Sequence, residues 1–268
     1  MLLVGDIHGC LEEFEELLRT AEYNRERDRL VLLGDLVDRG PDPVGVVRRA
    51  RELGAESVLG NHEEKHLRFR RHEAKKATNA GYKNPMKPFT DQRLKEHLAY
   101  SEADWAYIEA MPITIQLPGN WLAVHAGLEN GIPFEKQRAD KMIRVRYVDD
   151  KGSMKAISSD TNQPNGTRQW AEVCEEPRHI AYGHMALNMA KPVFGRFVQA
   201  AGFAAHAEGH DDLTWYRAAL DTACCFGGTL SALILSADGV LTVPPEEATV
   251  SAKAKGTYAQ LCTDRDDA

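Results

Sequence analysis

The sequence predicts an α/β protein in which strands and helices alternate in the N-terminal part of the chain. Three short apolar runs each end at a glycine, at residues 1–4, 30–33 and 57–59. Between them, apolar side chains recur at helical spacing over 11–21, and prolines open a second helical pattern at 44–53. This order is that of a β-α-β-α-β unit, which buries a sheet against layers of helix.

The chain has the composition of an ordinary globular protein. Its 268 residues are 43% hydrophobic and 27% charged, and a chain of this length can bury a substantial core. The 40 acidic and 33 basic residues give a net charge of −7, which argues against a protein that coats DNA, so we expect no DNA-binding module. The 5 cysteines are odd in number and lack CxxC spacing, which argues against a disulfide framework or a thiolate zinc site.

The N-terminus and the lengths of the apolar runs indicate in which cellular compartment the protein is expected. No apolar run approaches the roughly 20 residues that span a bilayer. The chain enters its first strand at once, without the pattern of a signal peptide. We therefore expect a cytoplasmic protein with no membrane partner.

After the third strand, the pattern predicts a helical stretch, a hairpin and a second group of strands. We expect helices at 62–77, 91–100 and 102–110, the last capped by Ser101, with a loop at 78–90. We expect a hairpin around Pro118-Gly119-Asn120, between strands at 113–117 and 121–124. Later strands are expected at 178–182, 193–198, 213–220, 230–235 and 240–243.

Residues 129–177 lose this alternation and mix charges with glycine and proline. We interpret them as an insertion that caps the site, where substrate selectivity is usually found. Residues 1–243, including this insertion, are expected to form a single domain. Residues 244–268 are polar and are expected to form a partly disordered C-terminal tail.

Polar side chains follow the apolar runs where the strands end. Open α/β sheets bind ligands at the carboxyl ends of their strands, so these side chains are candidates for one common site. They are Asp6, His8, Asp35, Asn61, His125 and His184. Two carboxylates, an amide and three imidazoles suit a pair of divalent transition-metal ions better than calcium, which prefers oxygen ligands alone. Asp35 is the expected bridge between the two ions. We expect Mn²⁺ first, with iron, zinc and nickel left open.

Five motifs, in the order GDIHG, GDLVDRG, GNHE, HAG and GH, resemble those of the calcineurin-like metallophosphoesterases. The resemblance is to the branch shared by phosphoprotein phosphatases and ApaH-like phosphatases. It implies a layered β-sandwich of two mixed sheets flanked by helices, with an inserted cap region. It also implies direct attack on the phosphate by a hydroxide bridging two metal ions, without a covalent enzyme intermediate. The first ion would be held by Asp6, His8 and Asp35, and the second by Asp35, Asn61, His125 and His184.

The same resemblance implies roles in catalysis and phosphate binding. His62 would be the general acid that protonates the leaving oxygen, with Asp38 orienting it. Arg39 and Asn61 would bind the phosphate, and a guanidinium can hold two phosphate oxygens at once. Further phosphate-binding arginines are expected in the insertion region, where the candidates are Arg144, Arg146 and Arg168.

The sequence leaves the phosphoester open. The segment DTACCFGGTL at 221–230 is similar to a late segment of ApaH-like bacterial phosphatases, although Ala223 replaces a usual glycine. The HAG motif is also more similar to ApaH-like phosphatases than to phosphoprotein phosphatases. Asp38 argues the other way, because the bacterial tetraphosphatases usually carry another residue at its position. Basic side chains between Lys65 and Lys76 are more simply a solvated helix face than a track for a polyanion.

The main hypothesis is therefore a metal-dependent phosphatase of the ApaH-like, serine/threonine protein phosphatase type. The alternatives within the same fold are a dinucleoside polyphosphate hydrolase of the Ap4A type and an RNA 5′-end pyrophosphohydrolase. Outside the enzymes, the alternative is a noncatalytic regulatory module that binds metal and phosphate. The expected partner is in every case a phosphorylated substrate or ligand.

Overall fold

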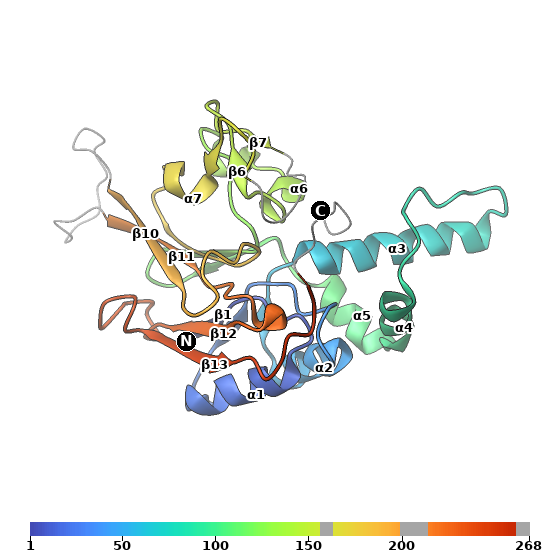
Figure 1. Ribbon diagram of the computed structural model, residues 1–268, viewed down its shortest axis with the longest axis horizontal. Helices are drawn as coiled ribbons and strands as arrows, with labels where there is room; N and C mark the ends of the chain where they lie inside the picture. The colour runs from blue at the N-terminus through green and yellow to red at the C-terminus, as the bar shows by residue number, and fades with distance from the viewer. Residues whose placement is uncertain (156–162, 199–213, 261–268) are drawn as a thin grey trace.

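The described chain forms two packed β-sheets flanked by helices (Figure 1). The computed structural model describes residues 1–155, 163–198 and 214–260. The two main sheets have five strands each, in the orders β13-β12-β1-β2-β3 and β10-β11-β9-β5-β4. Both sheets contain parallel and antiparallel neighbours. The predicted sandwich of two mixed sheets is confirmed.

The first sheet contains the predicted β-α-β-α-β unit. Its strands are β1 (Leu2–Val4), β2 (Leu30–Leu32), β3 (Glu56–Ser57), β12 (Thr229–Ile234) and β13 (Thr249–Lys253). β1, β2 and β3 run parallel, whereas β12 runs antiparallel to β1. Successive side chains point to opposite faces, so that Leu2 packs beneath the helices and Leu3 packs against the second sheet.

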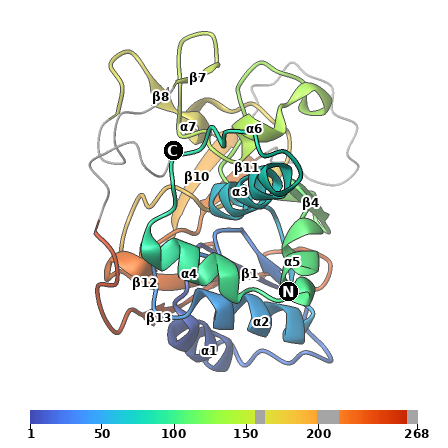
Figure 2. The same ribbon diagram turned by 90° about the vertical axis from the view of Figure 1, so that its right-hand side faces the viewer.

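Two helices cover the outer face of the first sheet, α1 (Leu11–Thr20) and α2 (Pro43–Leu53) (Figure 2). In α2, Pro43 occupies the first turn, and the Asp42 side chain accepts a hydrogen bond from the Gly45 amide at 2.8 Å. Gly54 ends this helix with φ 68°, a left-handed conformation that glycine adopts readily. The prolines therefore open the helix as predicted.

The second sheet holds the predicted hairpin and the later strands. These are β4 (Thr114–Leu117), β5 (Trp121–Val124), β9 (His179–Tyr182), β10 (Val193–Val198) and β11 (Thr214–Ala219). β4 and β5 form the hairpin, and β9 lies parallel between β5 and β11. Trp121 and Ala123 point toward the first sheet, whereas Leu122 and Val124 point to the opposite face. The whole segment that joins β10 and β11, residues 199–213, lies outside the described residues, together with its His206 and His210.

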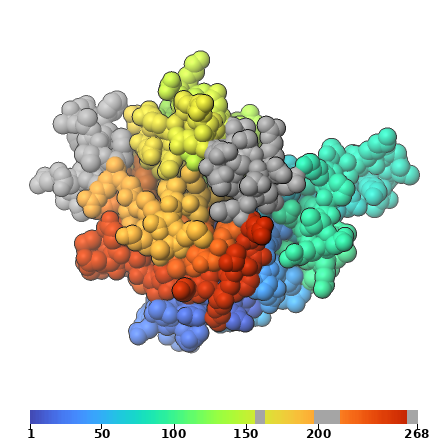
Figure 3. Space-filling view, viewed as in Figure 1, coloured from blue at the N-terminus to red at the C-terminus, as the bar shows by residue number. Residues whose placement is uncertain are grey.

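Along the chain, three helices connect β3 to β4. They are α3 (Asn61–Thr78), α4 (Asp91–Ala99) and α5 (Glu102–Glu109). α3 begins beside the sheets, and its far half projects from the body together with the loop that follows it (Figure 3). Phe69 of α3 stacks on Phe89 of that loop with ring centroids 3.9 Å apart. Ser101 caps α5 as predicted, since its Oγ accepts a hydrogen bond from the Asp104 amide at 3.2 Å.

The predicted insertion is described over 129–155 and 163–177. It contains the 3-10 helix η1 (Phe134–Lys136), the helices α6 (Ala139–Met142) and α7 (Trp170–Val173), and the strands β6 (Tyr147–Val148), β7 (Met154–Lys155) and β8 (Arg168–Gln169). The strands form a small sheet in the order β7-β6-β8. Trp170 is buried against Tyr182 with ring centroids 4.8 Å apart, so the insertion packs on the outer face of the second sheet.

The end of the chain differs from the prediction. The strand expected at 240–243 is wrong, because the chain turns there: the Gly239 amide donates to Ser236 O, and the Val240 amide donates to Ser236 Oγ. Pro244 and Pro245 follow, and a proline has no amide hydrogen for a strand ladder. β13 instead pairs antiparallel with β12, within the segment expected to be a disordered tail. The first sheet thus continues past residue 243.

Across the described segments, none of the helices combines the length and apolarity needed to cross a bilayer.

Candidate metal centre

The six polar residues predicted at strand ends converge on one buried site. Asp6 and His8 follow β1, Asp35 follows β2, Asn61 opens α3, His125 follows β5 and His184 follows β9. Each of the six side chains belongs to a residue that is at most 8% exposed. The two sheets therefore bring together groups that are spread over most of the chain, as the sequence predicted. Their roles as metal ligands stay a prediction.

Asp35 lies at the centre of this cluster. Its Oδ2 is 3.5 Å from His8 Nε2 and 3.3 Å from His125 Nε2. His125 Nε2 in turn lies 2.9 Å from Asn61 Oδ1 and 3.2 Å from His184 Nδ1. Asp35 therefore reaches residues predicted for both ions, which is the position that a bridging carboxylate needs.

Each of the three histidines has one ring nitrogen held by a backbone carbonyl. The pairs are His8 Nδ1 with Val37 O (2.8 Å), His125 Nδ1 with Leu33 O (2.7 Å) and His184 Nε2 with Arg144 O (3.3 Å). A carbonyl can only accept, so the nitrogen facing it carries a proton, and in a neutral ring the other nitrogen turns a lone pair into the cluster. Metal-binding histidines are usually fixed in this way. Lone pairs of imidazole, amide and carboxylate that face one another are suited to a shared cation, so the residues present fit divalent metal ions.

Protons compete with a metal ion for these groups. Burial lowers the pKa of His125, but the carboxylates of Asp35 and Asp6 and the Leu33 carbonyl together outweigh it and raise the pKa to about 9. Burial and the neighbouring Asp221 carboxylate raise the pKa of Asp6 well above its usual value. A cation that binds here displaces protons, so its affinity is expected to fall as the pH is lowered.

Asp221 is a third carboxylate at this site, and the sequence analysis missed it. It follows β11, and its Oδ1 accepts a hydrogen bond from the Ala223 amide at 2.9 Å. Burial raises its pKa, while the Ala223 amide and the Arg39 charge oppose that rise. The signal that could have found it is the one used for the others, an aspartate directly after a buried strand.

The backbone at the site is held in a left-handed conformation at several residues that are not glycine. The φ angles are 45° at His8, 51° at Asp35, 66° at Asp38, 69° at Arg39 and 65° at His184. Each such residue costs about 1–3 kcal/mol, so the surrounding structure must enforce it. This conformation turns the chain sharply after β1, β2 and β9 and aims the polar side chains there into the cluster.

Glu63 holds the backbone of the turn after β2 in this conformation. It belongs to the GNHE motif, but no role was predicted for it from the sequence. The fully buried carboxylate accepts hydrogen bonds from the amides of Asp35, Leu36, Val37 and Gly60, at 2.7 to 3.2 Å. It therefore ties the turn after β2 to the start of α3.

Glu63→Ala is expected to lower the free energy of unfolding by about 3 kcal/mol or more, because each buried amide left without an acceptor costs about 1–3 kcal/mol. Urea denaturation followed by circular dichroism measures the change. Glu52→Ala, at an exposed position of α2, is the control and should stay within about 1 kcal/mol. A Glu63→Ala protein as stable as the wild type would contradict the role in bracing the turn.

His62 and Asp38, predicted as the general acid and its partner, are in direct contact. His62 Nδ1 lies 2.6 Å from Asp38 Oδ2, and both residues are 2% exposed. His62 Nε2 faces the metal cluster, 3.9 Å from Asp35 Oδ2. Burial raises the pKa of Asp38, but hydrogen bonds from His62 and His66 outweigh it and hold the pKa well below its usual value. An ionised Asp38 keeps a proton on His62 Nδ1, so that Nε2 is the nitrogen that faces the cluster.

Arg39 lies against the cluster. Its Nη1 donates a hydrogen bond to His8 Nε2 at 2.8 Å, and its guanidinium lies 5.0 Å from the centroid of the Phe226 ring. Because a cation on His8 would use the same lone pair, the Arg39 contact and a metal ion at His8 exclude each other. Arg39 would then be released toward a phosphate beside the ion.

The insertion brings two of its three predicted arginines to the site. Arg146 Nη2 donates to His184 O at 3.4 Å, and Arg144 Nη2 pairs with Glu64 at 2.6 Å at the start of α3. Arg168 lies exposed on β8 opposite Val148, and within the described residues we find no contact between it and the cluster. The spacing of arginines in the sequence could not separate these cases, because the fold of the insertion decides which of them point inward.

The basic side chains of α3 are largely paired within the protein. Arg70 binds Glu102 at 2.8 Å, while Arg68 and Arg71 approach Glu64, which also binds Arg144. The simpler interpretation of a solvated helix face therefore suits Arg70. Arg68, Arg71 and Arg144 all approach the single carboxylate of Glu64.

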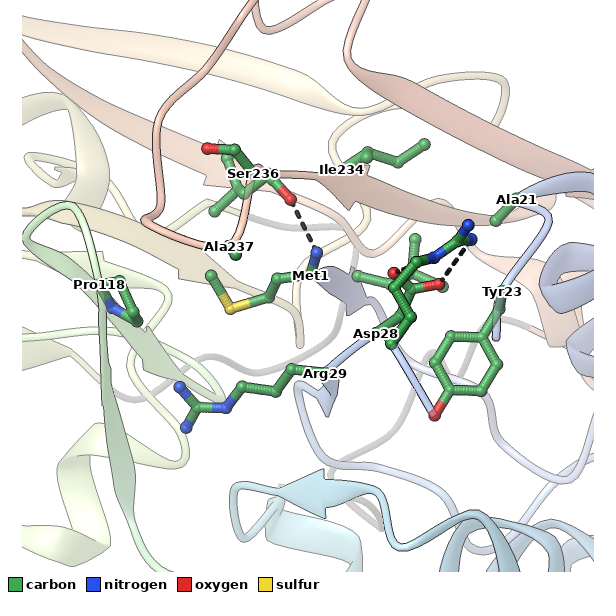
Figure 4. A pocket seen from close by; sticks show the side chains of 12 residues that line it. Met1, Ala21, Tyr23, Asp28, Arg29, Pro118, Ile234, Ser236 and Ala237 are labelled. Atoms are coloured by element: carbon green, nitrogen blue, oxygen red, sulfur yellow. Dashed lines mark hydrogen bonds and ion pairs between the residues drawn. The ribbon is translucent and has the colours of Figure 1, made fainter. Parts of the chain in front are cut away.

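Hollows in the described part of the chain lie away from the cluster. A cavity of about 390 Å³ is lined by Met1, Tyr23, Arg29 and Ile234 among others, at the opposite end of β1 from Asp6 (Figure 4). A second hollow of about 650 Å³ lies between the outer half of α3, the loop after it and α4. Neither is lined by a residue of the metal cluster, so the site is identified by its donor groups and not by the depth of a pocket.

The comparisons with known proteins agree with the geometry. Residues 1–212 match the family described as calcineurin-like phosphoesterase. The chain is 28% identical, over an alignment of 298 residues, to a symmetrical bis(5′-nucleosyl)-tetraphosphatase of Edwardsiella ictaluri, covering 95% of this chain and 99% of the relative. It is 29% identical over 275 residues to the tetraphosphatase of the same name from Photorhabdus laumondii, covering 86% and 92%.

Among solved structures, one provisionally assigned as a diadenosine tetraphosphatase superposes with a TM-score of 0.67 at 27% identity, covering 95% of this chain and 94% of the other. The family is one of hydrolases that use divalent metal ions, and the match extends over most of the chain. With the strand-end cluster and the two mixed sheets already in place, this match shows that the chain belongs to the calcineurin-like phosphoesterase family.

Proposed function

We propose that this protein hydrolyses dinucleoside polyphosphates and splits diadenosine tetraphosphate symmetrically into two molecules of ADP. The observation that carries this substrate is the end-to-end match with symmetrical tetraphosphatases, which leaves little of either chain unmatched. A shared family alone would not distinguish among phosphoesters, but relatives that align over their whole length narrow the choice. The comparisons thus favour the first alternative of the sequence analysis over its main hypothesis.

The protein phosphatase hypothesis has no specific support among the relatives described above. An RNA 5′ end shares the phosphoanhydride chemistry and stays a second candidate. The noncatalytic module is disfavoured by the family match and by the intact contact between His62 and Asp38.

The proposed chemistry assigns one task to each group of residues. When bound by the six residues of the cluster, two divalent ions would activate water and neutralise phosphate charge. His62 Nε2 faces the cluster and would donate a proton to the oxygen of the departing ADP, while Asp38 holds the proton on Nδ1. Arg39 would bind the phosphate that is attacked, and Arg144 and Arg146 would bind the neighbouring phosphates.

The proposed metal is Mn²⁺, with iron, zinc or nickel as the other candidates. Imidazole ligands admit all of these ions, and carboxylate ligands suit manganese, so availability decides between them. Metal analysis of the protein after purification without chelators would identify the ion that it carries.

The function is tested by incubating the protein with diadenosine tetraphosphate and Mn²⁺ and separating the products by ion-exchange chromatography. We expect ADP as the only nucleotide product, and faster turnover than for a phosphoserine peptide or triphosphorylated RNA assayed in parallel. The His62→Asn protein serves as the control for contaminating activity. The formation of AMP and ATP would refute the proposal. It would also be refuted if the protein left diadenosine tetraphosphate intact while it rapidly dephosphorylated the peptide.

A further inference from the structure

Asp38 has a second set of partners that the chemistry above does not use. While its Oδ2 contacts His62, its Oδ1 lies 2.7 Å from Arg93 Nε and 3.2 Å from His66 Nε2. Asp38 is 2% exposed, His66 is fully buried and the Arg93 side chain is only 15% exposed. The carboxylate is therefore held from both sides within the protein.

The same helix that carries Arg93 also holds the backbone of Asp38. Glu96 of α4 accepts a hydrogen bond from the Asp38 amide at 3.0 Å, and Tyr100 donates its hydroxyl to the same Glu96 oxygen at 2.6 Å. Asp38 needs this support because its φ is 66°, a conformation that a residue with a side chain avoids. α4 thus fixes both the backbone and the side chain of Asp38.

We propose that Arg93 and His66 are positioning residues that aim the Asp38 carboxylate at His62. Rotation of a carboxylate about its last bond is soft, so a single contact to His62 would leave Asp38 free to turn. Two donors on Oδ1 stop that rotation and leave Oδ2 directed at His62 Nδ1. The positive charge of Arg93 also balances Asp38 in a site where an unpaired buried charge would be costly.

A third cation site is a poorer interpretation of the same cluster. Asp38, His66 and Glu96 lie within metal-binding reach of one another. However, Arg93 already lies on Asp38 Oδ1, and Tyr100 and the Asp38 amide both donate to Glu96 Oε1. The oxygens that would bind an ion are therefore already hydrogen-bonded, and a guanidinium stands beside them.

This inference rests on the proposed role of His62 as a general acid, and it predicts how Arg93 variants depend on the leaving group. p-Nitrophenolate leaves readily, whereas phenol, with a pKa of about 10, needs protonation as it departs. Arg93→Met should lower kcat for phenyl phosphate by about 10-fold or more, and kcat for p-nitrophenyl phosphate by less than about 3-fold. A merely structural role would lower both rates equally.

A double-mutant cycle identifies the residue through which Arg93 acts. Asp38→Asn removes the charge that Arg93 holds, so Arg93→Met should cause little further loss of phenyl phosphate turnover in that background. Arg93→Lys should restore part of the loss because it keeps the charge, and His66→Gln should show the same dependence on the leaving group. Arg29→Met is the matched control, because Arg29 pairs with Glu56 and precedes β2, at the opposite end of that strand from the turn that holds Asp38.

The outcomes separate this inference from the proposed function. Equal losses on both aryl phosphates, or full additivity with Asp38→Asn, would overturn the positioning role. If Arg93→Met does not fold, Arg93→Lys and His66→Gln decide the same question with the same two substrates. Failure of the wild type to cleave diadenosine tetraphosphate would refute the proposed substrate and leave the cycle interpretable on aryl phosphates. A wild type inactive on every phosphoester would overturn both.

Discussion

Asp35→Asn is expected to weaken the binding of both metal ions at once and to abolish most of the activity. Asp35 Oδ2 lies within 3.5 Å of His8 Nε2 and of His125 Nε2, so the proposed bridge contributes to both positions. Loss of a group that only supports a metal ligand typically costs 10–100-fold in affinity, and loss of the bridge should cost more than about 100-fold. The exchange of carboxylate for amide keeps the shape of the side chain, and an Oδ1 acceptor is retained for the His62 amide.

Metal content after dialysis against limiting Mn²⁺, measured by inductively coupled plasma mass spectrometry, follows both ions in one experiment. Asp140→Asn provides the control, since Asp140 is exposed and pairs only with Arg138 among the ion pairs of the described residues. The wild type and the control should each hold two ions per chain, while the Asp35→Asn protein should hold fewer than one. A variant that retains two ions at wild-type affinity would remove Asp35 from the bridging role.

His62→Asn should separate turnover from metal binding. His62 is buried beside the cluster but is not one of the six proposed ligands. Its Nε2 lies 3.9 Å from Asp35 Oδ2, and its Nδ1 is hydrogen-bonded to Asp38. Removing a general acid typically costs about 10²–10⁴-fold in rate, so kcat for diadenosine tetraphosphate should fall by that factor. The metal content should stay at the wild-type level, because the six proposed ligands are unchanged.

The readouts are steady-state kinetics and metal analysis on the same protein batch. His72→Asn is the control on the same helix, where His72 contacts Tyr82 far from the cluster, and its kcat should equal that of the wild type. Parallel loss of metal and turnover in the His62→Asn protein would show that His62 serves the metal centre and is not the acid.

The contact between Arg39 and His8 gives the two proposed metal positions different surroundings. Arg39 donates to the His8 lone pair, while His125 Nε2 faces Asn61 Oδ1 and His184 Nδ1. A guanidinium and a divalent ion repel each other at such distances, so Arg39 must leave His8 when an ion binds there. This movement would place a positive charge where the phosphate is expected.

The sequence by itself determined the β-α-β-α-β succession of the first unit and the six residues of the cluster, and the resemblance to a known family added the two-sheet architecture. Asp6, Asp35 and Asn61 could be found because each directly follows an apolar run and a glycine, a local pattern that brings its polar residue to the end of a buried strand. The resemblance to a known family added His62 and its partner Asp38. Each of these signals lies within a few neighbouring residues.

Only the tertiary structure decided which arginines reach the site, how the histidine rings are oriented and how Asp38 is supported. Arg93 is 55 positions away from Asp38 in the chain, and Arg144 is 80 away from Glu64, so no local pattern connects them. The edge strand β13 was likewise missed, because pairing with β12 and not its own sequence makes it a strand. Contacts between distant segments depend on how helices and sheets pack, and that packing is set by the whole core at once.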